Sequence, residues 1–133
     1  MPKRYCYRIY GLNLTSAIEL PELRDLLDVG GTREAAVTVS LASLDETLVG
    51  MTTDGSYLQV SGDHCQFNVD GIARYRIEQG QRILVDPAPG SAPGDVRLFL
   101  IGSAFGALLH QRGCLPLHVS SVATPAGVWA FTG

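Results

Sequence analysis

Cysteine is scarce in this sequence, and it lacks the spacing that would make it chemically useful. The only three cysteines are Cys6, Cys65 and Cys114, and no C-x-x-C pair occurs. Zinc knuckles and redox motifs need closely spaced cysteine pairs, so neither is predicted. Isolated cysteines are typical of reducing compartments, and the sequence therefore predicts reduced thiols in a cytoplasmic protein.

Positive charge and long apolar runs are also lacking. The formal net charge is -3, and the only basic cluster is Lys3 with Arg4. Binding to nucleic acid needs several phosphate contacts, so nucleic acid is not expected as a partner. The longest apolar stretch, Leu98 to Leu109, is interrupted by Gly102 and Gly106, whereas a membrane span needs about 20 apolar residues. No apolar segment of the signal-peptide kind follows the first residues, so neither secretion nor membrane insertion is expected.

What the sequence does contain is enough apolar material for a folded core. Hydrophobic residues make up 46% and charged residues 17% of the chain. Short alternating or β-branched segments, bounded by glycine and turn residues, predict strands. They cover residues 5–10, 35–41, 58–60, 64–69, 72–78 and 82–86. Asp70-Gly71 and Gln79-Gly80-Gln81 predict hairpin turns. Residues 1–86 are therefore expected to form a mainly antiparallel N-terminal lobe, with a short helix beginning at Pro21.

A change in composition follows this lobe. Residues 87–94 are rich in proline and glycine and predict a linker between two lobes. A helix is expected over residues 95–112, with Asp95 in its first turn and Gly113 as its C-cap. Its apolar residues occupy nearly all faces, which predicts burial on several sides. Two further strands are expected at residues 117–122 and 128–132, joined by a turn at Thr124 to Gly127.

The last strand ends at a glycine, Gly133, which is how a phosphate-binding loop begins. The complete loop reads G-x-x-x-x-G-K-[ST]: backbone amides and the lysine hold the phosphates, and the hydroxyl binds magnesium. One glycine after a strand is weak evidence by itself, and its weight depends on the preceding segments.

Those segments, in their order and spacing, resemble the HPr kinase-related family, which includes serine-kinase-like proteins of lasso-peptide clusters. The matching stretches are Tyr7-Arg-Ile-Tyr-Gly-Leu, Gly71-Ile-Ala-Arg-Tyr-Arg-Ile, Ile83-Leu-Val-Asp-Pro, the segment from Val96 to Gly113, Leu115-Pro-Leu-His-Val-Ser-Ser-Val-Ala and Gly127-Val-Trp-Ala-Phe-Thr-Gly. The resemblance is loose before residue 70 and closer after it. In the family the last stretch runs directly into the phosphate loop.

This resemblance implies a fold, a function and cofactors. The fold would be α+β, with the helix and final strand pair (residues 95–133) beginning a P-loop kinase core like that of phosphoenolpyruvate carboxykinase. The activity would be ATP- and magnesium-dependent phosphorylation of a serine in a small carrier protein or peptide. Gly133 matches the first loop glycine, and His118 matches the histidine that opens the strand pair. Val119-Ser120-Ser121 departs mildly from the family's Ala-Ser-Ala.

The residues that would perform phosphoryl transfer have no counterpart in this sequence. The loop lysine, its following Ser or Thr and the acidic groups for magnesium are absent, so we expect a truncated and inactive kinase portion. A non-catalytic module that recognises a carrier protein or leader peptide is the alternative. The final apolar strand would expose its edge, which predicts self-association.

The remaining candidates have simpler interpretations. His118 is equally compatible with a strand histidine that hydrogen-bonds to the backbone. His64 lacks neighbours at metal-ligand spacing, and His110 suits a helix C-terminus. We also expect structural or surface roles for three groups: Ser120 and Ser121; the acidic residues Glu19, Glu22, Asp25 and Asp28; and the tyrosines Tyr5, Tyr7 and Tyr10.

Overall fold

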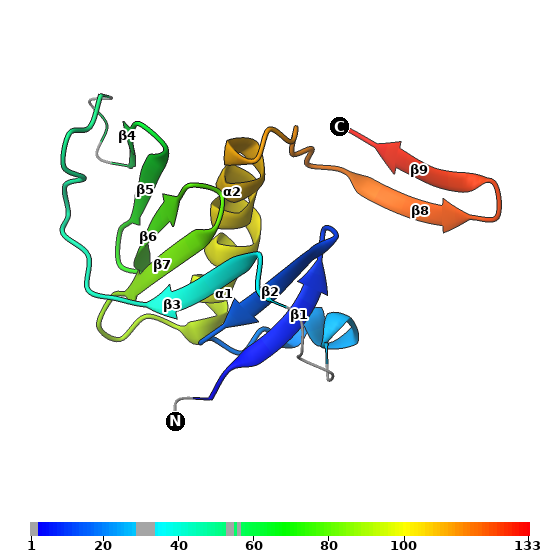
Figure 1. The fold of residues 1–133 in the computed structure, drawn as a ribbon, viewed down its shortest axis with the longest axis horizontal. Coiled ribbons are helices and arrows are strands. Elements are labelled where there is room, and N and C mark those ends of the chain that lie inside the picture. Colours follow the sequence, from blue (N-terminus) through cyan, green and yellow to red (C-terminus); the bar gives the residue numbers. More distant parts are fainter. Residues whose placement is uncertain (1–2, 29–33, 53–54, 56) are drawn as a thin grey trace.

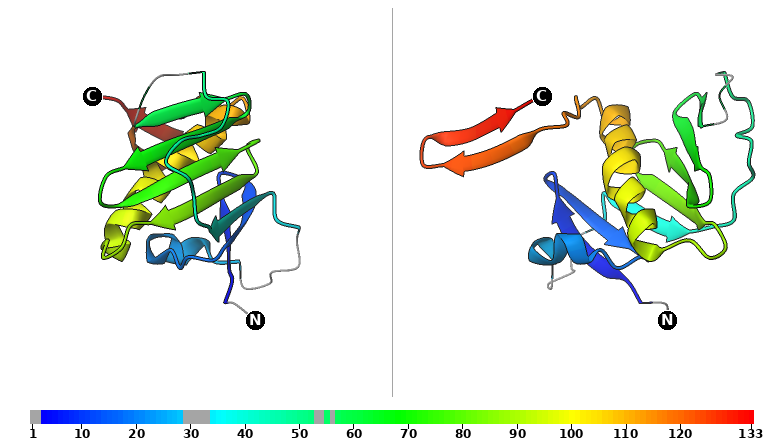
Figure 2. Two further views of the ribbon diagram at one scale, coloured as in Figure 1. Left: turned by 90° about the vertical axis from the view of Figure 1, so that its left-hand side faces the viewer. Right: turned by 180° about the vertical axis from the view of Figure 1, so that it is seen from behind.

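A seven-stranded sheet forms the body of the protein. The computed structural model describes residues 3–28, 34–52, 55 and 57–133. The sheet has the order β1-β2-β3-β7-β6-β5-β4, and a helix crosses one of its faces (Figure 1, Figure 2). Its strands are β1 (Tyr5–Ile9), β2 (Leu12–Ser16), β3 (Val37–Leu41), β4 (Leu58–Ser61), β5 (His64–Val69), β6 (Ala73–Glu78) and β7 (Arg82–Pro87). The α+β class is confirmed.

The strand pairing is more mixed than the sequence predicted. The four pairings β1–β2, β4–β5, β5–β6 and β6–β7 are antiparallel. Strand β3, however, runs parallel to both of its neighbours, β2 and β7. The reason is topological: β3 is inserted between the first hairpin and the later meander, and it reaches both through long connections.

Tight turns set the register of the hairpins. Tyr10 and Gly11 both have positive φ, 54° and 73°, as a two-residue turn of the mirror-image type requires. They connect β1 to β2, a strand that the sequence patterns did not reveal. The predicted connection at Gln79-Gly80-Gln81 is confirmed between β6 and β7, with positive φ at Gln79 and Gly80.

The helix is continuous from Pro93 to Gln111 and contains a wider turn at its centre. It consists of α1 (Pro93–Phe99), the π-helical segment η2 (Leu100–Ala104) and α2 (Phe105–Gln111). It begins two residues before the predicted position, because Pro93 can occupy the first turn, where no amide donor is needed. Gly113, with φ of 77°, ends the helix as predicted. A 3-10 helix, η1 (Pro21–Leu26), follows the first hairpin.

The core lies between the sheet and this helix. The buried stripe of the helix consists of Val96, Leu100, Ala104, Phe105 and Leu108. The helix was predicted to be buried on several sides, but its outer side is open, and Leu98 is 67% exposed. The expected linker at residues 87–94 is followed by a helix that packs on the preceding sheet. The Tyr75 hydroxyl fixes this contact by donating to the Val96 carbonyl at 2.8 Å.

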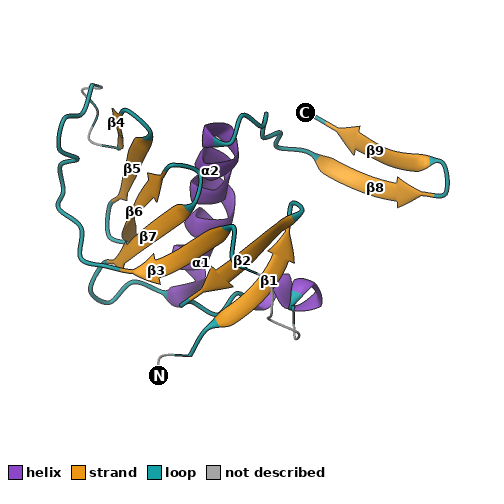
Figure 3. Cartoon of the chain, in the orientation of Figure 1, coloured by secondary structure: helices purple, strands orange, loops and turns teal. Residues whose placement is uncertain are grey.

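A second, two-stranded sheet projects from this body (Figure 3). It is the hairpin of β8 (Ser120–Thr124) and β9 (Gly127–Phe131), close to the predicted ranges 117–122 and 128–132. Every residue of both strands is exposed. The sequence from residue 114 to residue 133 contains no lysine, arginine, aspartate or glutamate.

Candidate functional site

The two residues that the sequence singled out lie together at the open end of the projecting hairpin. The last paired residues of this sheet are Ser120 and Phe131. His118 precedes this pair by two positions and Gly133 follows it by two, so the antiparallel register brings both to the same end. Both side-chain positions are exposed. The structure therefore places the histidine and the glycine that would begin a phosphate loop at the same end of the hairpin.

The groups available at this end do not complete a site for ATP and magnesium. Phosphate loops combine backbone amides with a lysine, and the magnesium needs a hydroxyl or carboxylate ligand. Residues 114–133 supply backbone amides, hydroxyls and one imidazole, but no ammonium, guanidinium or carboxylate side chain. The residues present therefore do not fit the cofactors that the resemblance implies, and we derive no phosphoryl-transfer step from them.

Other residues that the sequence analysis considered form contacts that hold the fold together. Tyr7 is buried in the core, where its hydroxyl accepts a hydrogen bond from the Leu20 amide at 2.8 Å. Glu22 forms an ion pair with Arg97 at 2.8 Å, which ties η1 to α1. His64 lies between Asp63 (2.7 Å) and Glu78 (3.8 Å). Among the described residues, no group of three or more His, Cys, Asp or Glu is arranged to hold a metal ion.

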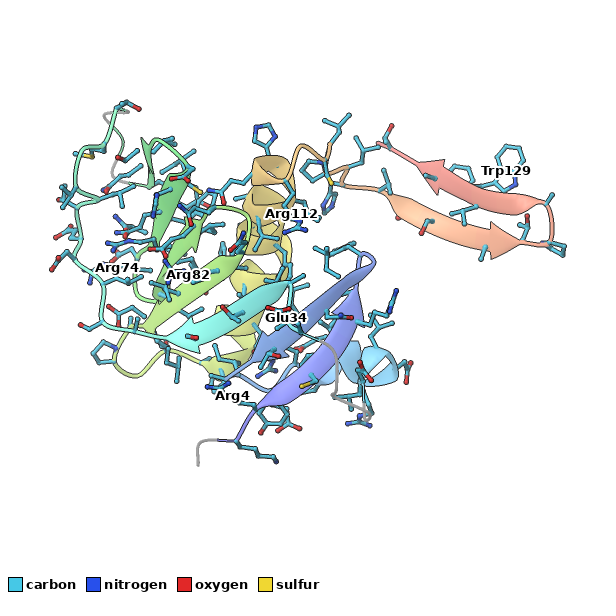
Figure 4. All side chains as sticks on the ribbon, viewed as in Figure 1. Arg4, Glu34, Arg74, Arg82, Arg112 and Trp129 are labelled. Carbon is cyan, nitrogen blue, oxygen red and sulfur yellow. The ribbon has the colours of Figure 1, made fainter. Side chains whose placement is uncertain are left out.

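The face of the sheet opposite the helix is polar, and the sequence analysis overlooked it. Successive side chains of a strand point to opposite sides of the sheet. Because Cys65, Ile77 and Ile83 point into the core, the residues next to them on each strand point to the other side. We call this side the polar face. On β4 to β7 it carries Gln59, Gln66, Asn68, Arg74, Arg76, Glu78, Arg82 and Asp86. Arg74 and Arg82 are labelled in Figure 4. The polar positions in the β5 and β6 segments were the available signal.

A segment of the chain is bound across this face by side chains. We call residues 44–48 the strap; they lie outside any helix or strand. Asp86 accepts from the Leu44 amide at 2.9 Å, and Arg74 donates to the Leu44 carbonyl at 3.2 Å. At the other end, Gln59 accepts from the Leu48 amide at 2.6 Å. The strap is thus held at both ends through its backbone.

The centre of the strap is held by amide side chains. The Glu46 carbonyl accepts from Gln59 at 3.0 Å, from Asn68 at 2.9 Å and from Gln66 at 3.3 Å. Gln66 also donates to the Asp45 carbonyl at 2.8 Å. Gln66 is completely buried under the strap. Buried amides must be hydrogen-bonded, and here the strap's backbone provides most of the acceptors.

A cleft of about 540 Å³ opens beside the strap. Its lining includes Glu46 of the strap and Asn68, Arg74 and Asp86 of the polar face. Arg74 and Asp86 are 3.8 Å apart and remain partly exposed, so both bind the strap and face the cleft. The cleft therefore extends the strap-binding surface into open space.

Comparisons with known proteins do not identify this architecture. No model of a protein family matches the chain, and no curated protein and no solved structure is significantly similar to it. In the part of the chain that the structure describes, no helix is both long and apolar enough to cross a membrane.

Proposed function

We propose that this chain is the N-terminal portion of an ATP-dependent serine kinase related to HPr kinase. In this proposal β9 leads into the phosphate-binding loop at Gly133, and the acceptor is a serine of a small carrier protein or peptide. The observation that carries the proposal is the approach to Gly133: a short, apolar, paired strand that ends two residues before the glycine. Phosphate loops are entered from such strands.

Two further features support the proposal. Trp129 and Phe131 are 62% and 59% exposed, which fits a hairpin that belongs to a larger apolar core. The outer side of the long helix is also apolar and open, and an alanine Cβ at Gly102 or Gly106 would meet no atom within 4 Å. Both surfaces are apolar and uncovered among the described residues, as contact faces for further structure would be.

The coding sequence after the codon for Gly133 tests the proposal directly. We expect four codons of any kind, followed by Gly-Lys-Ser or Gly-Lys-Thr, because only this spacing completes the loop. A stop codon at that position, or a continuation without the lysine, contradicts the kinase assignment.

This chain alone is expected to have no ATP turnover. The charged groups that neutralise the γ-phosphate and position magnesium supply most of the catalysis in phosphoryl transfer, and residues 114–133 contain none of them. The measurement is a coupled ATPase assay with magnesium, with a P-loop ATPase as the positive control. Turnover above the protein-free background would contradict this expectation if the same activity stays with the chain through a second purification step.

A second candidate function is a binding module for a carrier protein or leader peptide. The observation that favours it is the polar face, which already holds the backbone of one peptide segment through five strand-borne side chains. The two functions are compatible, since a kinase also needs a surface for its protein substrate.

A further inference from the structure

We propose that the polar face of β4 to β7 is a peptide-binding surface, and that the strap occupies it as an internal competitor. The external ligand would be a short peptide with two aliphatic side chains four positions apart and polar residues between them. This inference uses only residues 44–86, so it does not rest on the kinase assignment.

The polar face binds the backbone of the strap. The amide and carbonyl of Leu44 are both bonded, to Asp86 and to Arg74, and Gln59 bonds both the Glu46 carbonyl and the Leu48 amide. Paired donor and acceptor contacts of this kind fix the direction and register of a peptide. They require no particular side chain from it, so a different segment can form them.

The side chains that bind the strap are also preorganised. Arg76 donates to Gln66 Oε1 at 2.9 Å, which orients the Gln66 amide so that its NH₂ group points to the strap. The same NH₂ group donates to Asn68 Oδ1 at 3.0 Å. These residues lie on β5 and β6, in the middle of a hydrogen-bonded meander. Rigid elements that hold polar groups in place lower the entropic cost of binding.

The strap carries two buried leucines. Leu44 and Leu48 are only 6% and 5% exposed, while Asp45, Glu46 and Thr47 between them are exposed. Neither leucine belongs to the core between the sheet and the helix. Opening of the strap would therefore leave the contacts of that core in place, which is the condition for local opening. The two buried leucines define the side chains that a competing peptide must carry.

The cleft beside the strap offers room for a longer ligand. The side chains of Asn68, Arg74 and Asp86 continue from the strap into the 540 Å³ cleft, which is also lined by Tyr57 and Asp70. A ligand longer than the strap therefore finds further polar surface beside it. The strap fills only part of the surface that the same residues form.

A tethered segment competes strongly with a ligand in solution. Intramolecular binding acts at an effective concentration on the order of millimolar, so the free chain should bind the external peptide weakly. Opening the strap should remove this competition and increase the apparent affinity. Competition from the strap would thus lower the apparent affinity for every external peptide, so that only a peptide that binds the polar face tightly would displace it.

The test uses a fluorescent synthetic peptide with the sequence of residues 43–49 and the full chain. In the released variant, Leu44→Ala with Leu48→Ala, fluorescence anisotropy should show binding at least ~10-fold tighter than in the unchanged chain. Adding Gln66→Ala should abolish this gain, because the central donor is lost. Val49→Ala is the matched control, since Val49 is 87% exposed beside the strap and should change nothing. A peptide with alanine at both leucine positions should not bind.

Two results would overturn the inference. One is a released variant that keeps the cooperative thermal transition of the unchanged chain and yet does not bind the peptide. The other comes from hydrogen exchange on the unchanged chain, which does not depend on any variant folding. Millimolar peptide should accelerate exchange of the Leu44 and Leu48 amides, which are bonded to Asp86 and Gln59. Unchanged exchange at these two amides would mean that the peptide does not displace the strap.

Discussion

At the scale of single residues, Cys65 links the stability of the core to pH. Burial raises the pKa of its thiol from the ordinary 9.0 to about 11. Because the folded state holds the proton more tightly than the unfolded state, this contribution is fully present below pH 9 and is lost as pH rises toward 11. The loss should amount to roughly 2–3 kcal/mol, since one pKa unit corresponds to ~1.4 kcal/mol.

Urea unfolding of the unchanged chain and of Cys65→Ala at pH 8 and at pH 11 measures this effect. The fall in the free energy of unfolding between the two pH values should be smaller in the variant by roughly that amount. Burial also raises the pKa of Tyr7 and Tyr75, which remain in both proteins and therefore cancel. Cys114→Ala, at an exposed position, is the matched control for the removal of a thiol group. Equal falls in the unchanged chain and in Cys65→Ala would show that the thiol is not protected from ionisation.

At the scale of elements, two glycines of the helix should respond oppositely to the same substitution. An alanine Cβ at Gly106 meets no atom within 4 Å, so Gly106→Ala should stabilise the helix by about 0.5–1 kcal/mol through reduced chain entropy. At Gly113 the space is also open, but φ is 77°, so Gly113→Ala should destabilise by about 1–2 kcal/mol. Thermal unfolding of both variants checks the pair. Destabilisation by Gly106→Ala would mean that another surface packs on this side of the helix.

The sequence predicted the elements whose signals are local. The alternation of side-chain types predicted β5, and the strand-forming residues on either side of Gly80 predicted β6, β7 and the hairpin between them. Gly113 predicted the end of the helix. Strand β2 was missed because Leu12-Asn-Leu-Thr-Ser follows a turn at Tyr10-Gly11, where a tyrosine takes the positive φ that usually marks glycine. The π-helical turn at residues 100–104 was not predicted, because its apolar residues continue the pattern of an ordinary helix.

Less of the candidate site than of the fold could be predicted from the sequence. Gly133 and His118 were found because they belong to a sequence pattern, and the hairpin register brings them together. Gln59, Gln66 and Asp86 were not found, because the strap that they bind is 11 to 42 residues away in the chain. Their role comes from tertiary contacts, which periodicity does not encode. The polar residues that alternate along β5 and β6 were the available signal.

At the scale of the whole molecule, the order of the strands determines which segment of the chain covers the polar face. Strand β3 separates the first hairpin from the meander β7-β6-β5-β4, and the chain after β3 must return across the polar face to reach β4. That crossing is the strap. The edges of the large sheet are partly covered: the Asp28 amide bonds to the Cys6 carbonyl beside β1, and the Thr52 amide bonds to the Val60 carbonyl beside β4. The projecting hairpin has no such cover among the described residues.

This hairpin should make the chain self-associate. An isolated two-stranded hairpin is marginally stable in water, and natural sheet edges usually carry charges that prevent pairing. Here Val122, Trp129 and Phe131 lie on one side of the hairpin with 56%, 62% and 59% exposure, and residues 114–133 contain no charged side chain other than a protonatable histidine. Pairing of two such hairpins would bury apolar surface and satisfy the free strand edges at once.

Sedimentation equilibrium and the emission of Trp129, the only tryptophan, report this association independently. We expect the average mass to rise with concentration and the emission to shift to shorter wavelength, because the indole leaves water when hairpins meet. Val122→Lys with Phe131→Lys should raise the dissociation constant at least ~10-fold, which is ~1.4 kcal/mol of binding free energy. Val49→Lys adds the same kind of charge at an exposed apolar position on the body and should leave association unchanged. A single monomeric species at every concentration, with constant Trp129 emission, would show that an exposed and uncharged hairpin is tolerated in this fold.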